Sequence, residues 1–387
     1  MIESALPAST RKLVSAAKDI AANVLVPNAA RTDAECSWPQ HAFDAFRAAG
    51  LLGLHVPKRF GGHEEGLLAL ATITETLAAG CPSAAICYGM HCVGSAVITA
   101  KATPFQEERY LRPIARGEHI TTLSLSETGT GAHFYLPQTT LRREGDNFVV
   151  QGTKQFVTNA GHADSYVISA QGDGAVGAGE FSCLVVDRET EGIRWLEPWH
   201  GFGMRGNASR GLELPGVRIP SANLLGAEGD QIWYVFEVVA PYFLIAMAGT
   251  YVGVAQAALD LTIEHLHARQ YDFSGERLSE MPVLQQRVAQ MWTMVEKTRL
   301  LVQTAARLGD LGDEGALVRL LACKADAGET AVTVTNEAMT LGGGMAYREN
   351  STLARLLRDA RASHVMSPTT ELLRQWQGRA LLGLPLV

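Results

Sequence analysis

The residues best suited to bind a ligand lie in a glycine-interrupted stretch, 121–166. Ser126 and Thr158 carry hydroxyl groups that can hydrogen-bond to the polar edge of a planar heterocycle. Gly129 and Gly131 let backbone amides approach a ligand closely, because no Cβ atom stands in the way. On spacing alone, the pattern favours an ordinary β-hairpin with a glycine-rich turn, since short motifs often match by chance. A ligand-binding loop is the alternative interpretation.

Antiparallel strands are predicted to position this loop. Apolar and polar residues alternate at 147–150, and the turn signal at 144–147 leads into them. Another apolar run at 184–187 is typical of a strand, and Gly, Asp and Pro separate short strands throughout 121–225. We expect these strands to form a central, β-rich part of the chain.

Helical periodicity precedes and follows the β-rich part. Residues 81–98 are apolar on nearly every side, which predicts a buried helix. His91 lies in that helix and is interpreted as a core histidine, because no second His or Cys stands at metal-ligand spacing. The chain is therefore expected to be α+β, with further helices over 8–33, 39–50, 65–80, 106–111, 230–268, 282–310, 313–341, 350–364 and at the C-terminus.

Composition and charge exclude several classes of protein. The 387 residues are 47% hydrophobic and carry a net charge of −7, without the basic stripe typical of nucleic-acid binding. The first residues do not combine a basic with an apolar region, and we expect no uncharged apolar run to reach membrane-spanning length. A cytoplasmic protein without a metal site is therefore predicted. The cysteines form no C-x-x-C pair and are interpreted as reduced thiols: Cys36, Cys81, Cys87, Cys92, Cys183 and Cys323.

The motif SETGTG at 126–131, followed by QGTKQFVTNAGHADSY at 151–166, resembles the flavin-binding strands of the acyl-CoA dehydrogenase superfamily. LLGLHVP at 51–57, GGG at 342–344 and RLLRDAR at 355–361 also resemble family segments, in the family's order. The resemblance implies an N-terminal helical domain, a middle β-barrel-like domain and a C-terminal four-helix bundle. The expected bounds of these domains are 1–120, 121–225 and 226–387.

The resemblance also implies FAD as the cofactor and assigns residues to it. Ser126 would hydrogen-bond the isoalloxazine edge, Thr158 would approach its N5 atom, and Phe156 would pack against the ring. Arg269 would contact the pyrophosphate of a neighbouring subunit's FAD, which implies a homodimer or homotetramer. The implied FAD contacts are Leu125, Ser126, Gly131, Ala132, Phe156, Thr158, Arg269, Phe273, Gly343, Gly344 and Thr369.

The chain departs from the family pattern near these contacts. Ala132 and His133 replace a Ser-Asp pair, and Leu341 replaces a Gln. Phe273 comes one residue late after Arg269, so we expect that loop to be altered.

A carboxylate base is missing from the position where most family members carry a Glu. In those members the base takes the α-proton of the substrate while hydride leaves the β-carbon for the flavin. Counted from the RDA motif, that position is Ser367, which has no basicity at neutral pH. Ser367 is instead predicted to cap a helix, with Pro368 at the first helical position. Glu371, His364 and Glu237 are weak candidates for the base.

A minority of the family places the base on the long helix after the β domain, ahead of an Arg. Phe243 and Leu244 stand there, so base and Arg are both absent. Three functions stay open. The first is an FAD-dependent oxidoreductase of an acyl-CoA or acyl-carrier protein, with electron-transfer flavoprotein as a possible partner. The second is a flavin-dependent monooxygenase, and the third is a non-catalytic partner subunit of a heteromeric acyl-CoA dehydrogenase.

Overall fold

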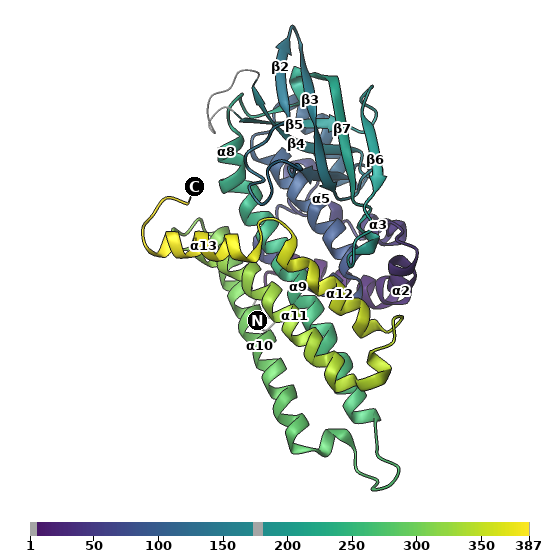
Figure 1. Cartoon of the computed structure of the whole chain (residues 1–387). Coiled ribbons are helices and arrows are strands. Elements are labelled where there is room, and N and C mark those ends of the chain that lie inside the picture. The colour runs from purple at the N-terminus through teal and green to yellow at the C-terminus, as the bar shows by residue number, and fades with distance from the viewer. Residues whose placement is uncertain (1–5, 173–180, 387) are drawn as a thin grey trace.

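The computed structural model describes residues 6–172 and 181–386, so the extreme N-terminus that entered the localisation prediction lies outside it. Figure 1 shows a β-sheet at one end of the molecule and a long helical bundle that extends away from it. Further helices from the N-terminal part lie beside and below the sheet. Along the chain the order is helical, then β, then helical, and the predicted α+β fold is confirmed.

Helix α5, Pro82–Ala100, packs against α4 (Leu67–Gly80) of the N-terminal part, against the long helix α9 (Ala240–Ala268) and against the first strand, β1 (Thr121–Ser124). Every residue at 82–98 is buried, so the predicted buried helix is confirmed. His91 Nε2 lies 2.9 Å from the Leu52 carbonyl, and its Nδ1 accepts the Thr121 amide at 3.2 Å, as expected of a core histidine. The other N-terminal helices are α1 (Ala8–Ile20), joined by a π-helical turn to α2 (Val26–Ala34), α3 (Gln40–Ala48), α6 (Pro104–Gln106) and α7 (Arg112–Ala115).

Two helical segments, Pro82–Ala100 and Gln231–Ala268, are long and apolar enough to cross a membrane by length and composition alone. The expectation that no uncharged apolar run reaches that length is therefore wrong for α5, whose 19 residues include no Asp, Glu, Lys or Arg. Within the fold, 89% and 78% of the two apolar windows are buried. A core helix passes the same composition test, because a helix covered on all sides is apolar all round.

The described part of the β domain contains one sheet. Its strands are β1 (Thr121–Ser124), β2 (Thr140–Glu144), β3 (Asn147–Val157), β4 (Ser165–Gly172), β5 (Phe181–Asp187), β6 (Arg194–Pro198), β7 (Arg210–Pro220) and β8 (Leu224–Leu225). Their order is β6-β7-β3-β2-β4-β5-β8, with β1 parallel to β4. Strands β2 and β3 form the predicted antiparallel hairpin, in which Glu144 pairs with Asn147.

The C-terminal helices form the bundle, and α9 connects it to the rest of the fold. They are α8 (Gln231–Trp233), α9 (Ala240–Ala268), α10 (Pro282–Asp310), α11 (Ala316–Ala346), α12 (Thr352–Val365) and α13 (Thr370–Leu381). A π-helical segment, Tyr234–Val239, joins α8 to α9. Helix α9 packs against α10 and α11 within the bundle and against α4 and α5 outside it. Helix α9 thereby joins the bundle to the N-terminal helices.

Candidate active site

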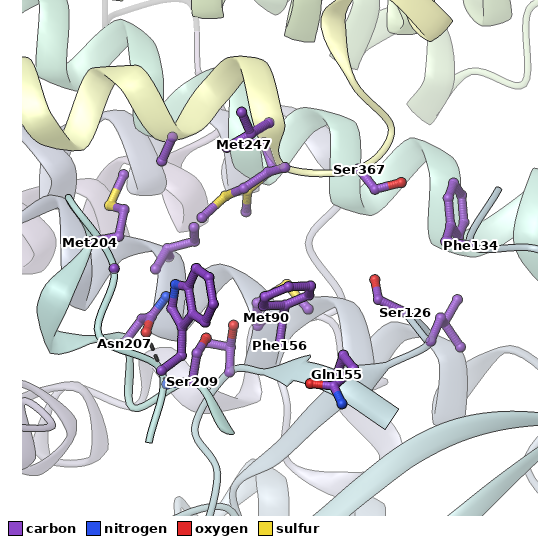
Figure 2. Close-up of a pocket in the computed structure, with 18 of the residues that line it drawn as sticks. Met90, Ser126, Phe134, Gln155, Phe156, Met204, Asn207, Ser209, Met247 and Ser367 are labelled. Atoms are coloured by element: carbon purple, nitrogen blue, oxygen red, sulfur yellow. Dashed lines mark hydrogen bonds between the residues drawn. The ribbon is translucent and has the colours of Figure 1, made fainter. Parts of the chain in front are cut away.

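A cavity of about 870 Å³ lies where the sheet, the N-terminal helices and the bundle meet. Figure 2 shows Met247 and Ser367 on one side of it, across from Ser126, Gln155 and Phe156. The volume is within the range of about 300–1,000 Å³ that small-molecule and cofactor sites occupy. Segments far apart in the sequence therefore enclose one space large enough for a ligand.

Phe156 projects into this space from an irregularity in β3. The register between β3 and β7 shifts between Lys154 and Val157, and Phe156 has a left-handed backbone with a φ of 55°. A bulge of this kind turns a side chain out of the regular alternation of a strand. The Phe156 ring is 54% exposed and meets Trp199 edge-on, with the ring centroids 5.2 Å apart. An aromatic surface is thus available to a flat ligand.

Hydroxyl groups line the sheet side of the cavity, among them those of Ser124, Ser126 and Thr158. The Ser124 hydroxyl is buried and has no hydrogen-bond partner among the described residues. Since buried hydroxyls normally have partners, this wall is suited to the polar edge of a ligand. Gly131 has a φ of +54°, and no atom lies within 4 Å of the point where its Cβ would be. These features fit the ring of FAD.

A buried ion pair holds the loop between β1 and β2 in place. The Glu127 carboxylate accepts hydrogen bonds from the Gln138 amide at 2.8 Å, from the Thr139 amide at 3.1 Å and from the Thr139 hydroxyl at 2.8 Å. The Lys154 ammonium also donates to it, and both side chains are buried. Burial lowers the pKa of Lys154, and the charge of Glu127 opposes this effect. These four donors occupy the Glu127 carboxylate, so it anchors the loop.

Ser367 and Thr369 belong to the segment after α12, and both residues line the cavity. The Ser367 hydroxyl donates to the Ala132 carbonyl at 2.8 Å and so links this segment to the loop after β1. The prediction that Ser367 caps a helix is wrong, because the Thr369 hydroxyl caps α13 and Pro368 precedes that helix. Both residues carry hydroxyls and lie two positions apart, so the sequence pattern did not distinguish them.

None of the three candidate bases lines the cavity. Glu237 and Glu371 are exposed, and His364 is half-buried with its Nδ1 3.1 Å from the Ser363 hydroxyl. Among the described residues that line the cavity, the one carboxylate is Glu127. The described residues of the cavity wall therefore offer no carboxylate besides that of Glu127.

Four of the predicted FAD contacts lie at the other end of the bundle. Arg269 ends α9 and is exposed, and Phe273 follows with an 87% exposed side chain. Gly343 and Gly344 stand near the end of α11, and both helix ends point away from the sheet in Figure 1. A small cavity of about 140 Å³ lies between these two helix ends. The four residues do not line the large cavity.

The structure brings the remaining predicted contacts together around the large cavity. They are Leu125, Ser126, Gly131, Ala132, Phe156, Thr158 and Thr369. Sequence reasoning did not identify the apolar residues that complete the walls, because no local pattern distinguishes them from the other apolar residues of the chain. These include Met90, Trp199, Phe202 and Met247.

Sequence models of the acyl-CoA dehydrogenase N-terminal, middle and C-terminal domains match residues 7–118, 122–217 and 241–382. The chain therefore belongs to the acyl-CoA dehydrogenase family. It is accordingly an FAD-dependent oxidoreductase of the acyl-CoA dehydrogenase type, and the predicted family and cofactor are confirmed.

Individual relatives match over nearly the whole chain. Cyclohex-1-ene-1-carbonyl-CoA dehydrogenase from Geobacter metallireducens is 34% identical over 94% of this chain and 96% of its own. Short-chain specific acyl-CoA dehydrogenase from Homo sapiens is 29% identical over 95% of this chain and 89% of its own. The solved structure of butyryl-CoA dehydrogenase from Megasphaera elsdenii is 25% identical, with a TM-score of 0.92 over 97% of this chain and 99% of that one.

Proposed function

We propose that the protein transfers hydride between FAD and an acyl thioester whose reaction does not require a carboxylate base from this chain. The observation that carries this proposal is the composition of the cavity wall. Ser367 stands at the position that the family resemblance assigns to the base, and Glu127 is already bound by four donors. When bound, FAD supplies the hydride chemistry, so the protein needs to orient the thioester and manage its proton.

Residues of the sheet side are suited to hold the flavin ring. Phe156 offers its exposed ring for packing, and Ser126 and Thr158 offer hydroxyls to the polar edge. Gly131 leaves room for the backbone to approach the cofactor. The opposite side, with Met247 and Ser367, then faces the acyl group.

The absence of a carboxylate base favours one class of substrate over another. A serine hydroxyl is a poor base, so abstraction of an ordinary α-proton would be slow. The relative from Geobacter metallireducens is named for cyclohex-1-ene-1-carbonyl-CoA, an acyl group whose α-carbon carries no hydrogen. We extend this property to the present chain and propose an α,β-unsaturated acyl thioester as its substrate. Its dehydrogenation still breaks two C–H bonds. The hydride would pass to FAD, and the proton would pass to a water molecule from the γ-carbon, which the conjugated thioester acidifies.

Anaerobic flavin bleaching tests the proposal. FAD-loaded protein is mixed with saturated straight-chain acyl-CoAs and, in parallel, with cyclohex-1-ene-1-carbonyl-CoA. We expect the unsaturated thioester to bleach the flavin and the saturated ones to do so at least about 100-fold more slowly, since a positioned base contributes about 10²–10⁴ in rate. Equal and rapid bleaching by saturated acyl-CoAs would contradict the proposal.

The same preparation separates the other open functions. Oxygen consumption by the chemically reduced protein, with incorporation of oxygen into the thioester, would indicate a monooxygenase. Failure to bind added FAD would indicate a partner subunit without catalysis. The rates of flavin bleaching by one acyl group, attached to CoA in one sample and to an acyl-carrier protein in another, decide between these two carriers.

A multimeric assembly and an electron acceptor complete the proposal. Arg269, Gly343 and Gly344 lie far from the large cavity, which supports an arrangement in which they contact the FAD of a second copy. We therefore propose a homodimer or homotetramer. Electron-transfer flavoprotein is proposed as the acceptor, and reduction of that protein by bleached enzyme is the corresponding assay.

A further inference from the structure

Lys324 lies on α11 behind the segment that follows α12. Its side chain is fully buried, which is rare for lysine unless it has partners. The Nζ atom donates to the carbonyl oxygens of Ser363 at 2.7 Å, Met366 at 2.9 Å and Pro368 at 2.8 Å. An ammonium group has three N–H donors, so these three carbonyls use all of them.

The three carbonyls lie at the end of α12 and in the segment that leads into α13. The last turn of a helix leaves carbonyl groups without intrahelical amides, and Ser363 lies in the last turn of α12. A positive charge at that end also interacts favourably with the helix dipole. Lys324 therefore supplies both the donors and the charge that the end of α12 lacks.

We propose that Lys324 is a positioning residue of the active site. It holds residues 363–369, named here the Ser367 segment, so that Ser367 and Thr369 face the cavity. On the cavity side this segment is fixed by the hydrogen bond from Ser367 to the Ala132 carbonyl. The inference rests on the proposed function, because it assigns the segment to the reacting side of that cavity.

The electrostatics agree with this geometry. Burial lowers the pKa of Lys324 to about 7, and the charge of Glu371 on α13 acts in the opposite direction. His364 on α12 is the other titratable group whose charge interacts with Lys324. A neutral amine has two N–H groups and would leave one of the three carbonyls without a donor. The Ser367 segment should therefore loosen as the pH rises through about 7.

Hydrogen exchange on the FAD-loaded protein tests this inference directly. Lys324→Met removes all three donors at similar length, and Lys324→Gln keeps two. The matched control is Thr330→Val on the same helix, where the Thr330 hydroxyl meets the Thr298 hydroxyl at 2.8 Å inside the bundle. We expect the amides of residues 364–367 and 369 to exchange at least about tenfold faster in Lys324→Met, with partial rescue by Lys324→Gln and no change in the control. Unchanged exchange in Lys324→Met would overturn the inference.

Flavin bleaching provides the second readout. Lys324→Met should lower the bleaching rate at saturating cyclohex-1-ene-1-carbonyl-CoA by about tenfold while the half-saturating concentration changes less, because the apolar walls stay in place. Equal kinetics in Lys324→Met and Thr330→Val would contradict a positioning role. If the wild-type protein is bleached by no acyl thioester, the proposed function fails, and the exchange data still decide whether Lys324 holds the segment.

Discussion

The carboxylate of Asp359 accepts a hydrogen bond from the backbone N–H of Met204 at 2.6 Å, across 155 residues of sequence. The contact joins α12 to the loop before β7, and both elements line the large cavity. Asp359 is buried, and burial raises its pKa to about 7, while the Met204 amide acts in the opposite direction. One side chain thus connects the bundle to the sheet at the wall of the active site.

Asp359 should make the stability of the fold depend on pH below neutrality. An aspartate in an unfolded chain titrates near pH ~3.9, so between about pH 4 and 7 the folded state holds a proton that the unfolded state has lost. The contribution of Asp359 to the unfolding free energy therefore falls as the pH rises through this window. Asp359→Asn keeps an acceptor for Met204 and should remove that slope from urea-unfolding data. Identical slopes in the variant and the wild type would contradict this assignment.

Lys154→Met should destabilise the fold and release FAD. It leaves the buried Glu127 carboxylate without its cation, which costs about 3–5 kcal/mol in comparable buried pairs. The loop between β1 and β2, which Glu127 anchors, should then bind the cofactor less tightly. Urea unfolding and flavin absorbance after gel filtration measure the two effects. The control is the double variant with Glu127→Gln, which removes the unpaired charge and should recover part of the stability.

Ser367→Glu should create activity toward saturated straight-chain acyl-CoAs. Because Thr369 caps α13, a carboxylate at 367 is not placed to be stabilised by the first amides of that helix. The largely apolar cavity would instead raise its pKa, as a general base requires. We expect bleaching by butyryl-CoA to accelerate on the order of 10²-fold, whereas Ser367→Gln, similar in size and uncharged, should give no gain. If Ser367→Glu does not accelerate flavin bleaching by butyryl-CoA, the cavity lacks some other requirement for this reaction besides the base.

Arg269→Ala should weaken both assembly and flavin retention. Arg269 is exposed at the far end of the bundle and does not line the large cavity, so in the proposed oligomer the FAD of a second copy would lie against it. Light scattering and flavin absorbance at matched protein concentrations test the two effects together. A wild-type monomer that retains all its FAD would refute the shared site.

Local patterns explain which parts of the structure could be predicted. The turn at 144–147 could be predicted because its turn-forming residues are adjacent in the sequence. The buried helix at 82–98 could be predicted because its apolar residues form one continuous run. Lys324 was not found, because its three carbonyl partners are 39, 42 and 44 residues away and nothing nearby marks the lysine as buried. The helix cap was assigned to the wrong hydroxyl, Ser367 instead of Thr369, because tertiary contacts decided between two equivalent local signals.

Helix α5 differs from α10 in how freely its residues can vary. In α10, buried positions recur every three or four residues, at Met291, Val295, Thr298 and Val302. A library of random substitutions should therefore tolerate changes at the exposed positions between them, with the periodicity of a helix. Positions 82–98 of α5 have no exposed side, and the same library should tolerate few changes at any of them. Sequence drift in this fold is therefore expected to be slowest along a continuous block of the chain that contributes few residues to the cavity.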